Sequence, residues 1–176
     1  MAQKVLFETA LTDLRTTDVE GLGNLRFDEK GNVDKWVKNS GTTALSAGGS
    51  CLERLTSVSA AVGQRIIAPD GVGAATGLVT LPAGVPHTAI AASGASTGDH
   101  GWVRVKGIMT TPVYQATTAL VQGQVSLATN VGGWDKPITF TAGYPSPIRH
   151  VRLCSALATT GAATANSCVV YVNCLG

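Results

Sequence analysis

Asp99 and His100 form the only adjacent acid–histidine pair in the chain, and a carboxylate that orients an imidazole is a common basis of nucleophilic catalysis. Neighbouring side chains on an extended strand point to opposite faces, so we expect no hydrogen bond between these two within a strand. Gly98 and Gly101 flank the pair, which favours a turn ahead of the strand that follows. The spacing therefore predicts a structural role for this histidine.

The other residues capable of chemistry are scattered along the chain. Glycoside cleavage by paired carboxylates needs two of them close together in space, and the candidates are isolated in sequence: Glu53, Asp70, Asp99 and Asp135. The glycine-rich run 71–77 lacks the Lys-Ser/Thr of a phosphate-binding loop and precedes a strand-like segment. The sequence predicts no enzyme, no cofactor and no metal, and a small hydrolase stays as an alternative.

The four cysteines, Cys51, Cys154, Cys168 and Cys174, include no Cys-x-x-Cys pair, which argues against a zinc site. Two interpretations remain open. Either the cysteines are small buried apolar residues, or a hairpin turning about Gly161 places Cys154 opposite Cys168, where a disulfide can form. Assembly in a cytoplasm favours reduced thiols.

The composition favours strands over helices. Hydrophobic residues make up 44% of the chain, dominated by small and β-branched types, and 21 glycines punctuate them. Residues 52–62 have an alternative helical spacing, which Thr and Ser weaken. We expect an all-β fold, a compact β-sandwich or jelly-roll-like barrel. Its predicted strands are 51–55, 65–68, 78–81, 88–92, 102–108, 113–115, 124–128, 138–141, 148–157 and 168–175.

The first 50 residues are expected to extend this domain as an arm and a β-hairpin. Leu25 and Phe27 alternate with charged residues, and extended spacing resumes at Val33. Between them lies a turn in which Gly31 takes a positive φ. The Gly/Thr/Ser/Ala-rich stretch that ends at residue 50 marks the boundary, so the predicted domains are 1–50 and 51–176.

Residues 23–39 (G-N-L-R-F-D-E-K-G-N-V-D-K-W-V-K-N) and 98–107 (G-D-H-G-W-V-R-V-K-G) resemble segments of the capsid decoration, or cement, proteins of tailed bacteriophages, as does the step over 119–127. The resemblance implies a structural virion protein that binds the outer surface of the assembled capsid and stabilises it. Its partner would be the major capsid protein, and such proteins are often homotrimers. The cysteines and the Ser/Thr/Ala-rich run between Cys154 and Cys168 depart from the pattern.

The strand predicted around 102–106 carries the candidate contact residues. A period of two places Trp102, Arg104 and Lys106 on one face and the two valines between them on the core. A tryptophan beside two cations is a common interface composition, although cationic stems lying over an ordinary surface tryptophan give the same pattern. Trp36, among charged neighbours in the hairpin, is a further candidate interface residue.

A binding module of another class uses the same side chains differently. In a tail-fibre or adhesin-type domain, exposed Trp36, Trp102 and Trp134 would stack on the sugar rings of host surface glycans. The sequence keeps this alternative open.

The charge of the chain and its targeting signals limit the partners and the cellular location that the sequence predicts. The net charge is +2, and acids are interleaved with the bases, so no basic stripe predicts a nucleic-acid partner. Acidic residues interrupt the first twenty residues, and no run approaches the roughly 18 apolar residues of a membrane span. We therefore expect synthesis in a cytoplasm, and the resemblance to decoration proteins implies a final place on the capsid surface. The charged fraction of only 14% also predicts self-association.

Overall fold

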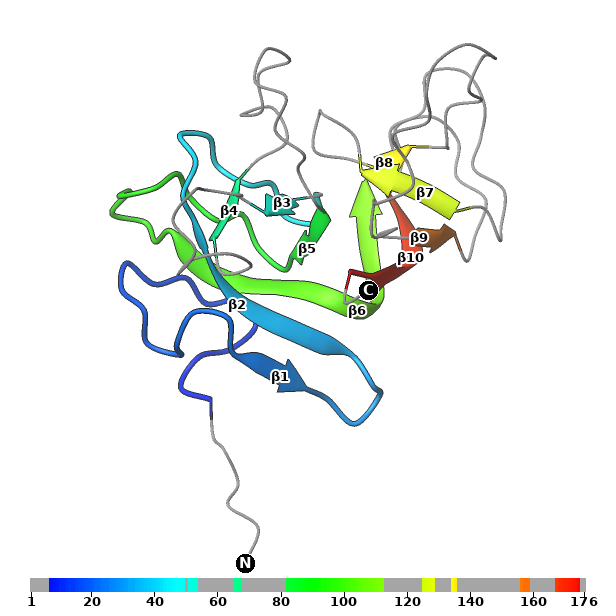
Figure 1. Cartoon of the computed structure of the whole chain (residues 1–176), viewed down its shortest axis with the longest axis horizontal. Coiled ribbons are helices and arrows are strands. Elements are labelled where there is room, and N and C mark those ends of the chain that lie inside the picture. The colour runs from blue at the N-terminus through cyan, green and yellow to red at the C-terminus, as the bar shows by residue number, and fades with distance from the viewer. Residues whose placement is uncertain are drawn as a thin grey trace, which may run out of the picture.

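The computed structural model describes residues 7–49, 51–53, 65–67, 82–112, 125–128, 134–135, 156–158 and 167–174. Every regular element in these ranges is a β-strand, which confirms the all-β prediction for this part (Figure 1). None of these residues lies in a helix with the length and apolar character that crossing a bilayer requires. The strands are β1 (Leu25–Phe27), β2 (Val33–Asn39), β3 (Cys51–Glu53), β4 (Arg65–Ile67), β5 (Pro82–Pro86), β6 (His100–Pro112), β7 (Val125–Ala128), β8 (Trp134–Asp135), β9 (Ala156–Ala158) and β10 (Ser167–Asn173).

The strands belong to one sheet with the order β1-β2-β4-β3-β5-β6-β10-β9-β7-β8, in which β2 also pairs with β6. The β2–β4 pair is parallel, and the other described pairs are antiparallel. At Val103 and Arg104, β6 pairs with β2 along one edge and with β5 along the other. The long strand β6 is therefore the centre of this half of the sheet.

Strand β6 changes partner along its length. Its first half pairs with β2 and β5, and from Lys106 to Pro112 it pairs with β10. Gly107 stands at this change with a φ of 117°, in the left-handed region that favours glycine. Figure 1 shows β6 curving upward there, toward β7 and β8. The curve creates a corner between the two groups of strands.

One face of the β2–β6 pair forms the hydrophobic core. Val37 of β2 and Val103 of β6 are buried there together with Val85, Ile90 and Val172 from neighbouring segments. Full burial of a side chain of this size contributes about 1.5–3 kcal/mol. The core therefore joins β2, β5, β6 and β10.

The opposite face carries two tryptophans that the segment before β1 covers. Trp36 and Trp102 are cross-strand partners whose ring centroids lie 5.3 Å apart. Phe7 packs edge-on against Trp102. The indole N–H of Trp102 donates to Thr9 Oγ1 at 2.8 Å, and that of Trp36 donates to Asp18 Oδ1 at 3.0 Å. The sheet is buried on both faces here, because this N-terminal segment packs on its own chain.

The N-terminal hairpin follows the prediction. Strands β1 and β2 pair antiparallel, and Gly31 in the turn has a φ of 78°. Strand β2 pairs with later strands and contributes to the same core. The sheet and the core therefore both extend across the predicted boundary after residue 50. The strands predicted at 78–81, 113–115 and 138–141 lie outside the described residues.

Strand β5 is not among the strands that the sequence predicted, and the strand predicted at 88–92 contributes only an isolated bridge at Ile90. The prolines of β5 stand at its ends, where a strand tolerates the missing donor. Gly84 has a φ of 144°, and a Cβ there would lie 2.7 Å from the carbonyl oxygen of Arg104. The glycine thus permits close approach to β6 instead of ending the strand.

The C-terminal strands pair in a different register from the predicted hairpin. Leu157 of β9 pairs with Tyr171 of β10. A turn that sets Cys154 opposite Cys168 would pair Leu157 with Ala165 instead. The register therefore contradicts that pairing.

Two cysteines show different chemistry. Cys174 is disulfide-bonded, so the expectation of reduced thiols is wrong at this position. Cys51 is fully buried, and its thiol lies 3.2 Å from the carbonyl oxygen of Gly84, to which it donates. Cys51 is the small buried residue that the first interpretation expected.

Candidate contact surface

The tryptophans expected at the surface lie inside the protein. Trp36 and Trp102 are both 0% exposed, so the prediction that these rings are accessible to a partner or a glycan is wrong. Strand alternation does place Trp102 opposite the valine face, but the segment that begins at Phe7 covers this second face as well. The side chain of Trp134 lies outside the described residues.

Arg104 also belongs to the interior, contrary to its predicted place in an interface. Its Nε donates to Asp34 Oδ1 at 2.7 Å and its Nη2 donates to Asp34 Oδ2 at 3.2 Å. His87 Nε2 lies 2.7 Å from the same Oδ1, and Arg104 Nη1 donates to the carbonyl oxygen of Ile108. The Arg104 and Asp34 side chains are 7% and 2% exposed, so this is a buried ion pair between β2 and β6.

Asp99 and His100 form a second buried pair, with His100 Nδ1 2.6 Å from Asp99 Oδ1. The exclusion of a hydrogen bond within a strand does not apply here, because β6 begins only at His100. Gly98, with a φ of 105°, turns the chain before the strand, as the flanking glycines predicted. Burial raises the pKa of Asp99, but the Gly94 N–H, His100 and Lys38 lower it more, so the net pKa lies below the ordinary 3.8.

Residues 94–98 carry a Gly-x-Ser-x-Gly pattern beside this pair, a sequence signal that bears on the hydrolase alternative. The pattern marks a nucleophile at a sharp strand-to-helix turn. Here it forms turns that lead into β6, Ser96 is exposed, and no hydrogen bond joins Ser96 to His100. The His100 ring instead stacks on the Trp36 ring, with the two ring centroids 6.4 Å apart. Ser96 and His100 therefore do not make the nucleophile–base contact of a serine hydrolase.

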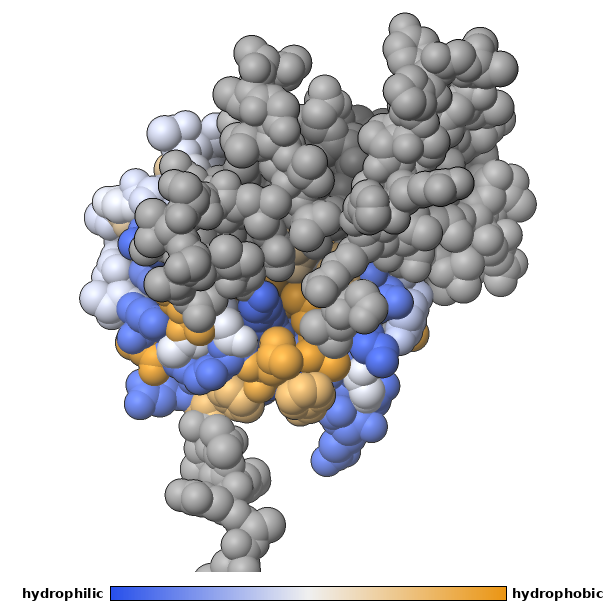
Figure 2. Space-filling model, viewed as in Figure 1, coloured by the Kyte–Doolittle hydropathy of each residue, from blue (hydrophilic) through white to orange (hydrophobic). Residues whose placement is uncertain are grey.

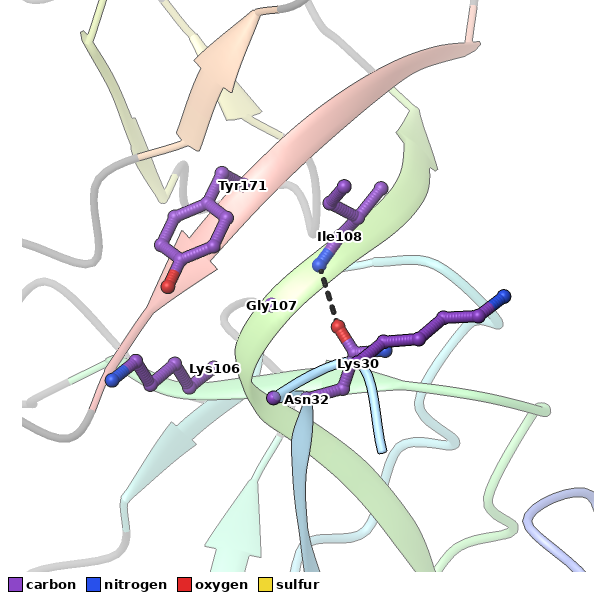
Figure 3. A pocket seen from close by; sticks show the side chains of 7 residues that line it. Lys30, Asn32, Lys106, Gly107, Ile108 and Tyr171 are labelled. Carbon is purple, nitrogen blue, oxygen red and sulfur yellow. Dashed lines mark hydrogen bonds between the residues drawn. The ribbon is translucent and has the colours of Figure 1, made fainter. Parts of the chain in front are cut away.

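Lys106 is the predicted contact residue that lies at the surface, where it is half-buried. It lines a hollow of about 560 Å³ between the turn of the β1–β2 hairpin and the curve of β6 (Figure 3). We call this hollow the corner pocket. Its lining residues are Lys30, Gly31, Asn32, Lys106, Gly107, Ile108 and Tyr171.

Asn32 holds the two walls of the corner pocket together. Its Oδ1 accepts a hydrogen bond from the backbone N–H of Ile108 at 3.1 Å, drawn as a dashed line in Figure 3. A Cβ on Gly107 would overlap this same oxygen, so only glycine lets the turn approach β6 so closely. The hairpin turn is thereby fixed against the curve of β6.

The hairpin turn is itself ordered by Asp28. This carboxylate accepts hydrogen bonds from the backbone N–H groups of Lys30 and Asn32 at 2.8 and 2.9 Å and from the Asn32 amide at 2.6 Å. The Asn32 side-chain bond is the main reason that the pKa of Asp28 lies below its ordinary value. Lys30 therefore projects from a backbone of fixed shape.

Large apolar side chains are exposed on the same hairpin and at the corner. Phe27 is 68% exposed and Ile108 is 58% exposed, with Leu25 and Tyr171 each at 37%. Figure 2 shows apolar residues gathered at the base of the molecule, near β1, with hydrophilic residues on either side. Such clusters mark sites of contact with other molecules.

No protein-family model matches the sequence, and no curated protein matches it either. Within the described ranges, no group of three or more His, Cys, Asp and Glu residues is placed to hold a metal ion. The exposed apolar side chains of the hairpin and the corner pocket are the surface features available for a function.

Proposed function

We propose that this protein is a non-enzymatic virion component that binds the outer surface of an assembled bacteriophage capsid and stabilises it, as decoration or cement proteins do. The resemblance of residues 23–39 and 98–107 to such proteins motivates the proposal. A protein that binds the assembled lattice better than free capsid subunits shifts the equilibrium toward the closed shell.

The exposed apolar edge of the hairpin is the observation that carries the proposal. Phe27 and Leu25 lie on β1, the first strand in the sheet order, whose outer edge pairs with no other described strand. An exposed strand edge with a large aromatic side chain suits contact with another protein. The acids and histidines nearest to catalytic patterns are instead paired with one another inside the fold.

We also propose that the strands close into a small barrel and that three copies assemble at one capsid site. In support of the barrel, the pairings run β2–β4–β3–β5–β6 and return to β2. The trimer rests on the resemblance and on the low charged fraction of 14%. Light scattering on the full-length chain at micromolar concentration tests it, and a monomer would contradict a preformed trimer.

Co-sedimentation with bare capsids, assembled from the major capsid protein of the same phage, tests the function. The native chain should sediment with capsids, and Phe27→Ser should weaken binding by about tenfold, as loss of an interface aromatic often does. Val19→Ser is the matched control, because Val19 is also exposed but lies outside the hairpin. The native chain staying in the supernatant while retained on host-surface glycans would contradict the proposal and favour the adhesin alternative.

A further inference from the structure

We propose that the corner pocket binds a carboxylate-bearing side chain from an extended, partly apolar peptide segment of a partner protein. The inference deepens the proposed function, since the capsid shell would supply that segment. Binding of such a peptide depends only on the pocket, so the peptide-binding proposal and the proposed capsid function can fail separately.

The charge of the pocket favours a carboxylate as its ligand. Lys30 and Lys106 line the pocket and make no ion pair with any residue that the structure describes. Of the acids in the adjoining turn, Asp28 is occupied by hydrogen bonds within that turn, and Glu29 is exposed to solvent. By contrast, the positive charge of Arg104 is paired with the Asp34 carboxylate through two hydrogen bonds. A ligand carboxylate would therefore complement the pocket.

The apolar wall of the pocket favours a peptide over a purely anionic ligand. Ile108 and Tyr171 line the pocket and are 58% and 37% exposed. In Figure 3 the Tyr171 ring and the Lys106 side chain project from neighbouring strands on one side of the β6 curve, whereas the Lys30 side chain extends away from them on the other side. A phosphate, a sulfate or a nucleic-acid backbone would use the lysines and leave this wall in water. A peptide with an aliphatic residue beside its acid uses both.

The fixed shape of the pocket also favours binding. The Asn32–Ile108 hydrogen bond and the close approach at Gly107 join its two walls, and the Asp28 bonds order the turn. A preformed site loses less conformational entropy when a ligand binds. A volume of about 560 Å³ accommodates a few side chains of a peptide.

Titration of the isotope-labelled full chain with two blocked hexapeptides, followed by NMR, tests the proposal. The acidic probe is acetyl-Ala-Leu-Glu-Leu-Glu-Ala-amide, and the matched probe has Gln in place of Glu. The acidic probe should shift the Ile108 methyl and Tyr171 ring signals and bind about tenfold more tightly than the Gln probe. Equal affinity of the two probes, or no shift at these signals, would overturn the proposal.

Variants locate the binding. Lys106→Gln should weaken binding of the acidic probe about threefold, and Tyr171→Ser should weaken it further. Lys30→Gln should weaken it less than Lys106→Gln, because the Lys30 side chain extends away from Lys106 and Tyr171 (Figure 3). Arg15→Gln is the control, because it removes one positive charge from an exposed pair outside the pocket and should leave the affinity unchanged. Equal loss in the control would mean that net charge alone attracts the peptide. Tighter binding of a heparin fragment than of the peptide would overturn the peptide as occupant.

Capsid co-sedimentation separates the two proposals. If the native chain and Lys106→Gln sediment equally well with capsids, the pocket has no role there although the decoration function stands. If the native chain binds the acidic probe at the pocket but not capsids, the pocket stands and the proposed function fails.

Discussion

The centre of the β2–β6 pair and the corner of the sheet contain the same kinds of side chain in opposite situations. At the centre, Trp102 is fully buried, and Arg104 donates from its Nε and Nη2 to the two carboxylate oxygens of Asp34. At the corner, Tyr171 is partly exposed, and Lys106 has no carboxylate partner among the described residues. An aromatic side chain beside a cation stabilises the fold at the centre of the β2–β6 pair, whereas the same combination forms an exposed surface at the corner.

The difference comes from what covers each region. The segment that begins at Phe7 packs over the tryptophans, and the valine core covers the other face of the same strands. At the corner, β6 leaves β2 and turns toward β10, so nothing in the described part of the chain covers Ile108. Exposure and pairing therefore decide the role of such residues better than their type does.

Trp102→Ala should have the largest effect on stability, because it removes a fully buried ring and its hydrogen bond to Thr9. We expect a loss of about 3–5 kcal/mol in the free energy of unfolding, measured with urea. Phe27→Ala on the exposed edge should change it by less than about 0.5 kcal/mol. Similar effects for the two variants would remove the distinction between the centre and the edge.

Asp34→Asn should come next, because it leaves the buried Arg104 charge without its carboxylate. We expect a loss of about 3 kcal/mol in urea-induced unfolding. Asp13→Asn is the matched control, since it breaks the exposed pair with Arg15, and such pairs contribute about 1 kcal/mol or less. A small effect of Asp34→Asn would mean that water reaches the central pair.

The sequence predicted the all-β class and the hairpin because both depend on local signals. Alternation and turn chemistry mark β1, β2 and Gly31 within a few residues of one another. The same rules failed at β5, where Gly84 serves a close approach to another strand that sequence does not display. The Arg104–Asp34 pair joins positions 70 residues apart, and only the register of β2 against β6 brings them together.

The contact surface was predictable only in part. The period of two grouped Trp102 and Arg104 with Lys106, but it could not show that an N-terminal segment covers the first of them. Lys106 reaches the surface because β6 turns at Gly107, and the exposed Tyr171 comes from β10 far along the chain. Such a site depends on tertiary register, which local patterns do not specify.

Gly107→Ala should have an intermediate effect that is specific to the corner. The substitution combines a positive φ with overlap against Asn32, and we expect a loss of roughly 1–3 kcal/mol in thermal or urea unfolding. Gly31→Ala is the matched control, because its φ is also positive but no atom lies within 4 Å of the added Cβ. Its loss should stay near 1 kcal/mol. Equal losses would mean that the turn moves away from β6 without penalty.

Acid titration should give the smallest effect and compare one carboxylate from each region, Asp99 at the centre and Asp28 at the corner. Both have pKa values below 3.8, Asp99 through Gly94, His100 and Lys38 despite its burial, and Asp28 mainly through Asn32. A carboxyl whose pKa is lower in the folded chain stabilises the fold above its unfolded pKa of about 3.9 and loses that contribution as the pH falls through its folded value.

The difference in stability between the native chain and Asp99→Asn should therefore be largest above about pH 4 and become smaller below it, and Asp28→Asn should behave likewise. Urea unfolding at a series of pH values measures both differences. We expect the difference for Asp99 to be the larger, because its buried bonds cannot be replaced by water as readily as those of the exposed turn. If the stability difference between the native chain and Asp99→Asn widened on acidification, burial would be raising the pKa of Asp99. The Asp99–His100 pair would then be a strained feature of the fold.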